Sequence, residues 1–180
     1  MRRRILTLPG WKGSDPIHWQ SRWEALHGFE RVEQHDWQQP RRGDWMARLD
    51  EVLLDGGDGR PVVLVAHSLG AQLVAAWAAH SRHAARVAAA LLVAPPDTER
   101  ADTPPALSLW RPMPMQRLPF PATLVASTDD PYCSLDRAGA LAQAWGAALV
   151  VAGARGHLNS DSDLGDWPAG LALFHELLSD

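Results

Sequence analysis

The chain has 180 residues, and its 17 basic and 21 acidic side chains give a formal net charge of −4. This length favours a single domain over 1–180 with one sizeable core, and a hydrophobic fraction of 46% argues against wholesale disorder. The mild acidity disfavours nucleic acid and anionic membranes as partners. The lone Cys133 cannot form an intrachain disulfide, and no apolar run is long enough to cross a bilayer. A cytoplasmic protein is therefore expected.

The first third of the chain predicts two strands and two helices in alternation. The predicted segments are a strand at 3–8, a helix at 15–26, a weaker strand at 31–35, and a helix that begins at Asp44 and stops at Gly56 and Gly57. In this second helix the apolar residues are spaced by three and four, so they share one face.

The rest of the chain repeats the alternation with more apolar strands. Residues 61–66 are apolar without alternation, as expected of a parallel strand covered on both faces, and they lead directly into an alanine-rich helix at 69–79. Further strands are predicted at 87–93, 123–127 and 147–151, with helices at 135–145 and from Trp167-Pro168 onward. Parallel strands require crossover helices, so the pattern predicts a three-layer α/β/α fold around an open, six-stranded, mostly parallel sheet.

One segment, 95–120, does not fit the alternation. Its seven prolines forbid a long helix or a paired strand, which leaves a loop excursion with room for a short helix. A connection of this length is either functional or a plain connection over the surface, and both interpretations stay open. Under the first, the segment carries apolar residues that suit a pocket wall, Leu107, Leu109, Trp110, Met113 and Met115, of which Trp110 and Met113 are the candidate substrate-binding residues.

The most specific local motif lies where the most apolar strand turns into a helix. Ala66-His67-Ser68-Leu69-Gly70 resembles the nucleophile elbow G-x-S-x-G, with alanine in place of the first glycine. In such an elbow a tight turn exposes the serine Oγ at a helix N-terminus, where partial positive charge favours an anionic intermediate. The alternative interpretation is that Ser68 is simply a helix N-cap.

A nucleophilic serine needs a base and an acid, and candidates for both follow later strands. Asp129 and Asp130 come after the strand at 123–127, and His157 comes after the strand at 147–151. Each alone could be a turn or loop residue. The chain order Ser, Asp, His is nevertheless the order of α/β-hydrolases, and the joint placement predicts a catalytic triad.

The oxyanion hole is predicted from backbone N–H groups. One donor is Leu69, which follows the nucleophile, and the other comes from the glycine-containing loop at 9–14, with Trp11 as the candidate. Phosphate-loop motifs are absent from this loop, the histidines show no metal-ligand spacing, and Cys133 lacks an elbow. Neither a cofactor nor a metal is expected.

Four ordered blocks carry a resemblance to a known family. They are Pro9-Gly10-x-x-Gly13-Ser14-x-x-x-His18-Trp19-Gln20, the elbow, Ser127 through Tyr132, and Gly156-His157-x-Asn159 through Trp167-Pro168. Together they resemble the YdeN and retinoblastoma-binding-protein-nine family of compact serine hydrolases.

The resemblance implies a minimal α/β-hydrolase with strand order 2-1-3-4-5-6 and no separate cap domain. It also implies a triad of Ser68, Asp130 and His157. Asp130 is preferred to Asp129 because the common acid-loop spacing places the carboxylate three residues after Ser127. The matching His18, Trp19, Asn159, Asp166 and Trp167 are expected to hold the loops around the site.

The implied activity is hydrolysis of a small-molecule ester through an acyl-enzyme, with amide cleavage as a variant. The alternative is a non-catalytic protein-binding module on a hydrolase scaffold. The family name also implies binding of the retinoblastoma protein, but the recognition string Leu-x-Cys-x-Glu is absent around Cys133. The protein partner therefore stays unknown.

Overall fold

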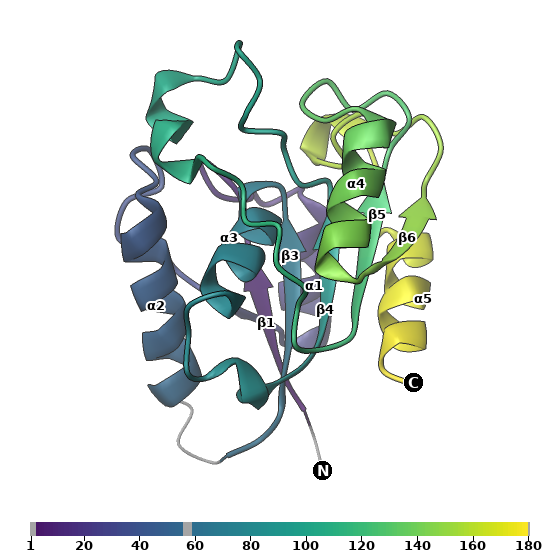
Figure 1. Ribbon diagram of the computed structural model, residues 1–180. Coiled ribbons are helices and arrows are strands. Elements are labelled where there is room, and N and C mark those ends of the chain that lie inside the picture. Colours follow the sequence, from purple (N-terminus) through teal and green to yellow (C-terminus); the bar gives the residue numbers. More distant parts are fainter. Residues whose placement is uncertain (1–2, 56–58, 180) are drawn as a thin grey trace.

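The computed structural model describes residues 3–55 and 59–179 (Figure 1). The strands are β1 (Arg4–Leu8), β2 (Glu30–Arg31), β3 (Val62–His67), β4 (Val87–Val93), β5 (Ala122–Ala126) and β6 (Ala148–Val151). The helices are α1 (Trp19–His27), α2 (Arg42–Asp55), α3 (Leu69–Ala78), α4 (Leu135–Trp145) and α5 (Pro168–Leu177), with short 3-10 turns η1 (Ala84–Arg86), η2 (Pro105–Trp110) and η3 (Ser160–Ser162).

The described residues form one six-stranded sheet of order β2-β1-β3-β4-β5-β6, in which each neighbouring pair is parallel. This confirms the predicted parallel sheet and the strand order that the family resemblance implies. Because the strands are parallel, the loops that follow β1, β3, β5 and β6 leave the sheet at the same edge. That edge is where the candidate site residues meet.

Helices cover both faces of the sheet, as the apolar strands predict. Alternate β3 residues point to opposite sides, so Leu64 and Ala66 join the core beneath α2, α3 and α4, whereas Val63 and Val65 pack against α1 and α5. Figure 1 shows the same three layers, with α5 on one side of the sheet and α2 and α3 on the other. The predicted α/β/α architecture is therefore confirmed.

Two predicted strand and helix ends need correction. The strand expected at 31–35 is the two-residue β2, because only Val32 beyond it still donates an N–H to Thr7 and the following residues are polar. The helix expected from Asp15 starts at Trp19, since the Asp15 carboxylate accepts backbone N–H groups and holds a turn there. The helix stop predicted at Gly56 and Gly57 lies outside the described residues.

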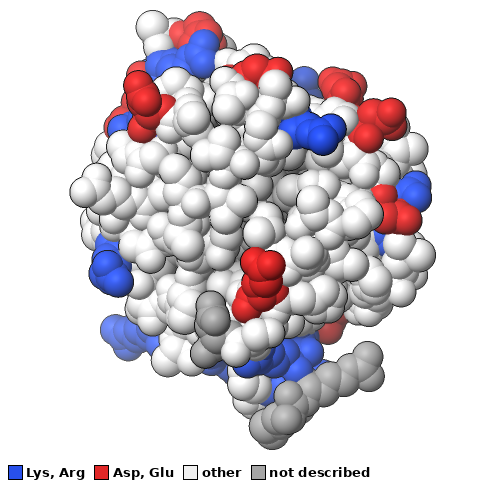
Figure 2. All heavy atoms as spheres, turned by 90° about the vertical axis from the view of Figure 1, so that its right-hand side faces the viewer, with Lys and Arg blue, Asp and Glu red and all other residues white. Residues whose placement is uncertain are grey.

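The strand β6 differs from the central strands because it is an edge strand of the sheet and pairs with β5 alone among the described strands. Leu149 and Val151 are 40% and 46% exposed. On the face that carries α5, uncharged residues predominate; one acidic side chain lies near the middle, and side chains of both signs lie around the rim (Figure 2). In the part of the chain that the structure describes, no helix combines the length and the apolar character that a bilayer crossing needs.

Candidate active site

The turn between β3 and α3 is a strained elbow. Ser68 has φ 55° and ψ −124°, a backbone conformation that is rare for a residue with a side chain, and its N–H donates to the Val93 carbonyl at 2.8 Å. A Cβ on Gly70 would lie 2.1 Å from the Leu8 carbonyl oxygen, so only glycine lets α3 start this close to β1. The turn therefore presents the Ser68 side chain above the sheet edge.

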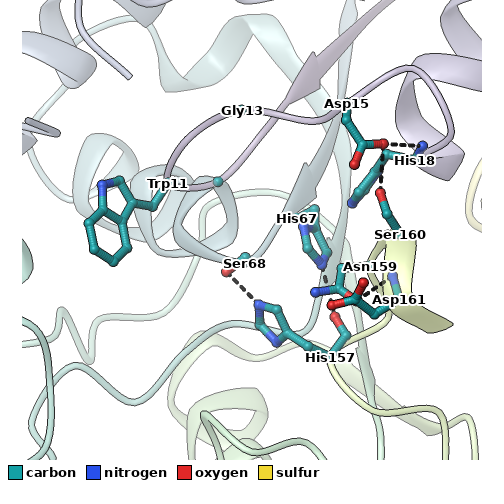
Figure 3. Close-up of a pocket in the computed structure, with 11 residues that line it drawn as sticks. Trp11, Gly13, Asp15, His18, His67, Ser68, His157, Asn159, Ser160 and Asp161 are labelled. Atoms are coloured by element: carbon teal, nitrogen blue, oxygen red, sulfur yellow. Dashed lines mark hydrogen bonds between the residues drawn. The ribbon is translucent and has the colours of Figure 1, made fainter. Parts of the chain in front are cut away.

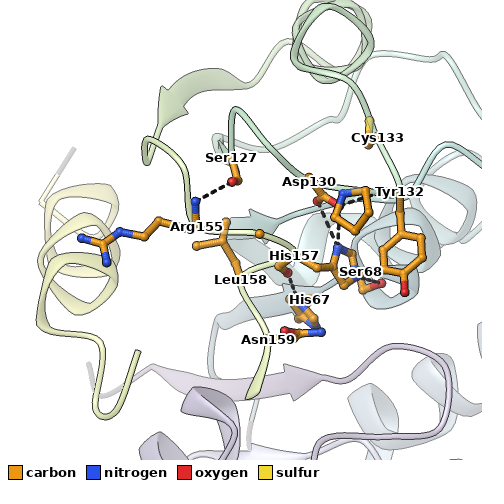
Figure 4. A network of polar contacts seen from close by, with 12 residues as sticks. His67, Ser68, Ser127, Asp130, Tyr132, Cys133, Arg155, His157, Leu158 and Asn159 are labelled. Atoms are coloured by element: carbon orange, nitrogen blue, oxygen red, sulfur yellow. Dashed lines mark hydrogen bonds and ion pairs between the residues drawn. The ribbon is translucent and has the colours of Figure 1, made fainter. Parts of the chain in front are cut away.

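Ser68 occupies the N-cap position of α3, but its side chain makes no capping bond within the described chain. Its Oγ lies 2.8 Å from His157 Nε2, and His157 Nδ1 lies 3.0 Å from each carboxylate oxygen of Asp130 (Figure 4). A carboxylate only accepts, so Nδ1 carries the proton and Nε2 is left to accept the Ser68 hydroxyl. The structure thus brings the three predicted residues into one hydrogen-bonded chain.

The loop after β5 directs its two adjacent carboxylates to different partners. Asp130 accepts the Tyr132 N–H at 2.9 Å besides facing His157, and its side chain is only 3% exposed. Asp129 points elsewhere and accepts the Ser127 hydroxyl at 2.7 Å and the Gly156 N–H at 2.8 Å. These hydrogen bonds, that of Ser127 first, lower the pKa of Asp129.

The loop that carries His157 is held on both sides. Ser127 Oγ accepts the Arg155 N–H at 2.9 Å, and His67 Nε2 lies 3.0 Å from the His157 carbonyl oxygen (Figure 4). The next residue, Leu158, is buried and its carbonyl accepts the Trp19 indole N–H at 2.9 Å. The imidazole is therefore positioned by contacts from β3, α1 and the loop after β5.

The loop after β1 runs directly over the elbow. A Cβ on Gly10 would lie 2.8 Å from Ser68 Cβ and 3.2 Å from the Leu69 nitrogen. Lys12 and Gly13 have positive φ values and turn the chain back, with the Lys12 N–H donating to Trp37. This path places Gly10, the residue before Trp11, beside the Leu69 nitrogen.

Two cavities open at Ser68. The apolar cavity, of about 370 Å³, is walled by Trp11, Leu69, Pro96, Pro104, Leu107 and Tyr132. The polar cavity, of about 210 Å³, is walled by Asp15, His18, His67, Asn159, Ser160 and Asp161 (Figure 3). His157 lines both of them.

Of the five residues predicted for a pocket wall in the 95–120 segment, Leu107 lines the apolar cavity at Ser68 and the other four line neither cavity. Trp110 is fully buried, donates its indole N–H to the Pro40 carbonyl at 2.7 Å and packs edge-on against Trp45, and Met113 is 4% exposed. Neither lines the two cavities that the described residues form at Ser68. The prediction for Trp110 and Met113 is therefore corrected, because a large indole finds more contacts and an acceptor in the core. From this segment the predicted Leu107 lines the cavity, together with Pro96 and Pro104.

Two buried histidines beside the cavities are neutral. Burial lowers the pKa of His18 to about 4 and that of His67 well below its usual 6.5. His18 is the N-cap of α1, where its Nδ1 accepts the Gln20 N–H at 3.1 Å. His18 was expected only to hold a loop; its position in a cavity wall had no signal in the sequence.

The other residues of the four sequence blocks hold loops together. Asn159 caps η3 by accepting the Asp161 N–H, Asp166 pairs with Arg22, and Trp167 packs against Trp19. These contacts join the loop after His157 to α1.

Cys133 is buried near Asp130, and burial followed by that carboxylate raises the pKa of its thiol to about 12. Such a thiol is a poor nucleophile.

The described residues contain no group of three or more His, Cys, Asp or Glu side chains arranged to hold a metal ion.

The sequence matches a known family over most of its length. Residues 5–176 match the family model described as serine hydrolase. No curated protein matches the chain in sequence.

Solved structures show the same fold. A YdeN-like hydrolase from Pectobacterium atrosepticum is 30% identical with a TM-score of 0.85, and the alignment covers 98% of this chain and 90% of that one. The ydeN gene product of B. subtilis is 22% identical with a TM-score of 0.76, over 99% and 100%. A thermophilic esterase from Thermogutta terrifontis is 15% identical with a TM-score of 0.72, over 99% and 90%.

Proposed function

Because the chain belongs to the serine hydrolase family, as a YdeN-like member of the α/β-hydrolase superfamily, we propose that it is a carboxylesterase that cleaves small acyl esters through an acyl-enzyme on Ser68. The observation that carries the proposal is the continuous chain from Ser68 Oγ through His157 to Asp130, with links of 2.8 and 3.0 Å. A capping serine would need neither partner. Both are aligned as general base and orienting acid.

The proposed reaction has two halves. In the first, His157 Nε2 takes the Ser68 proton while Oγ bonds to the ester carbonyl carbon. The C–O bond to the alcohol then breaks, and the departing alcohol oxygen takes the proton from His157. In the second half, His157 takes a proton from a water whose oxygen bonds to the acyl carbon; the bond from that carbon to Ser68 Oγ then breaks, Oγ takes the proton from His157, and the carboxylic acid is released. Asp130 accepts the Nδ1–H throughout and stabilises the imidazolium.

The N–H groups of Trp11 and Leu69 are the proposed donors that stabilise the negative charge on the carbonyl oxygen of the substrate. Leu69 lies in the first turn of α3, whose N-terminus adds partial positive charge. The close approach of Gly10 to Ser68 supports the pairing, because it brings the loop after β1 within reach of an oxygen bonded to the same carbon as Oγ.

The small volume of the apolar cavity is consistent with a short acyl chain on the substrate. Pro96, Pro104 and Leu107 form a wall from the 95–120 segment, which is too short to be a separate cap domain. We expect short acyl chains to be preferred over long ones among p-nitrophenyl esters.

The test combines labelling by a fluorophosphonate probe with hydrolysis of p-nitrophenyl acetate. Ser68→Ala should abolish labelling and lower kcat by about 10⁵-fold or more, with unchanged circular dichroism. The matched control is Ser108→Ala. Ser108 is an exposed serine on η2 that lines neither cavity at Ser68, so this variant should label and turn over as wild type does.

Unchanged turnover in Ser68→Ala would refute the nucleophile. A wild-type protein that neither labels nor hydrolyses esters or amides would favour the alternative, a protein-binding module on the same scaffold.

A further inference from the structure

The polar cavity contains a buried donor that the proposed triad does not use. His18 Nδ1 accepts the Gln20 N–H, so in the neutral ring the proton is on Nε2. That Nε2 is buried and has no hydrogen-bond partner among the residues that the structure describes. A buried polar atom without a partner is costly, and the residue that carries it lines a cavity that reaches Ser68.

His67 supplies the complementary group. Its Nε2 lies 3.0 Å from the His157 carbonyl oxygen, which can only accept, so Nε2 carries the proton and Nδ1 is an acceptor. The rings of His18 and His67 have centroids 4.7 Å apart, and both line the same cavity (Figure 3). Because burial keeps both rings neutral near pH 7, each retains one donor and one acceptor.

The charged side chains around the polar cavity further limit the kinds of ligand group that it can bind. Asp15 and Asp161 also line the polar cavity, so a carboxylate or phosphate would be repelled. An ammonium group cannot accept from His18 Nε2–H, and a methyl group would leave that donor unpaired. A hydroxyl group can accept from His18 and donate to His67 Nδ1 or to a carboxylate at the same time.

Building on the carboxylesterase function proposed above, we propose that the polar cavity binds a hydroxyl group on one arm of the ester, close to the scissile bond, while the apolar cavity takes the other arm. His18 is then a residue that determines specificity. Two kinds of ester share this chemistry, those of a diol or polyol with a plain acid and those of a hydroxy acid with a plain alcohol.

The experiment compares esters in which a hydroxyl replaces a methyl group. 2-Hydroxyethyl butyrate is paired with propyl butyrate, and ethyl 3-hydroxybutyrate is paired with ethyl 3-methylbutyrate. One pair should show a kcat/KM ratio of about 10 in favour of the hydroxyl, the value of a hydrogen bond that the methyl isostere leaves unmade. The pair that shows it identifies which arm enters the polar cavity.

The variant that isolates His18 is His18→Asn. Asparagine keeps a side-chain oxygen for capping α1 but removes Nε2–H. The ratio in the responsive pair should fall to about 2 or less, whereas fluorophosphonate labelling reports that Ser68 is still reactive.

Three outcomes would overturn the inference: no preference for the hydroxyl in either pair with wild type, which needs no folded variant; the same ratio in His18→Asn as in wild type; or a preference for the methyl ester. If wild type hydrolyses none of the four esters, it is the carboxylesterase function that fails.

Discussion

A single added methyl group at Gly10 should test the proposed oxyanion hole. The Cβ of Gly10→Ala would sit 2.8 Å from Ser68 Cβ, 3.2 Å from the His67 carbonyl oxygen and 3.2 Å from the Leu69 nitrogen. Gly10 has no positive φ, so the substitution introduces no backbone strain of its own and acts only through space. All three contacts belong to the elbow, which the Ser68 N–H bond to Val93 and the strained Ser68 backbone hold in place.

The size of the effect follows from these distances. Carbon atoms in contact sit about 3.5 Å apart or more, so the loop after β1 must withdraw by about 0.7 Å from Ser68 Cβ. Trp11 moves with Gly10, and its N–H leaves the position of the oxyanion by a similar distance. A displacement approaching 1 Å costs about 10²-fold in rate, as does loss of one oxyanion donor.

The assay is steady-state hydrolysis of p-nitrophenyl acetate by Gly10→Ala. Loss of an interaction made only in the transition state lowers kcat and kcat/KM together, so KM should stay nearly constant. The control is Gly43→Ala in α2, where an added Cβ meets nothing within 4 Å. It should keep wild-type kinetics and unfold at the same denaturant concentration or a slightly higher one. Wild-type kcat in a folded Gly10→Ala protein would refute the assignment of Trp11.

Two further predictions concern the carboxylates and the buried histidines. Asp130→Asn should lower kcat by about 10⁴-fold, because an amide cannot both orient His157 and stabilise its imidazolium. Asp129→Asn keeps an oxygen that can accept the Gly156 N–H, so it should lower kcat by less than about 10-fold. A larger loss of kcat at Asp129 than at Asp130 would reverse the assignment. The free energy of unfolding from urea titrations should fall between pH 7.5 and pH 5. The pKa of His18 is about 4 when folded and 6.5 when unfolded, so the unfolded chain binds more protons in this range, and the contribution of His18 is full above pH 6.5 and lost toward pH 4. Its share of the fall at pH 5 is about 2 kcal/mol, and an unchanged pH dependence in His18→Asn would contradict this origin.

The fold and the order of the candidate site residues could be predicted from the sequence. The apolar run of β3 and the helix directly after it identify the elbow, because no other junction among the described elements combines a strand buried on both faces with an immediate helix. Since parallel strands end at one edge of a sheet, Ser68, Asp130 and His157 had to come close once three strand ends were located. The hydrogen bonds of Asp129 and Asp130 to different partners agree with the preference for Asp130 that the family resemblance implied, whereas the chain order alone left both carboxylates open.

Other features depended on packing that no local pattern records. An apolar tryptophan in a proline-rich segment suits a pocket wall as well as a core, and Trp110 is in the core because Pro40, 70 residues earlier in the chain, accepts its N–H. The same holds for His18: its capping role is local, but the cavity beside it forms where the loop after β1, the end of β3 and the loop after β6 meet. Sequence patterns of period 2 and 3.6 report which face of an element is buried, whereas the groups that share a cavity are set by contacts between residues far apart in the chain.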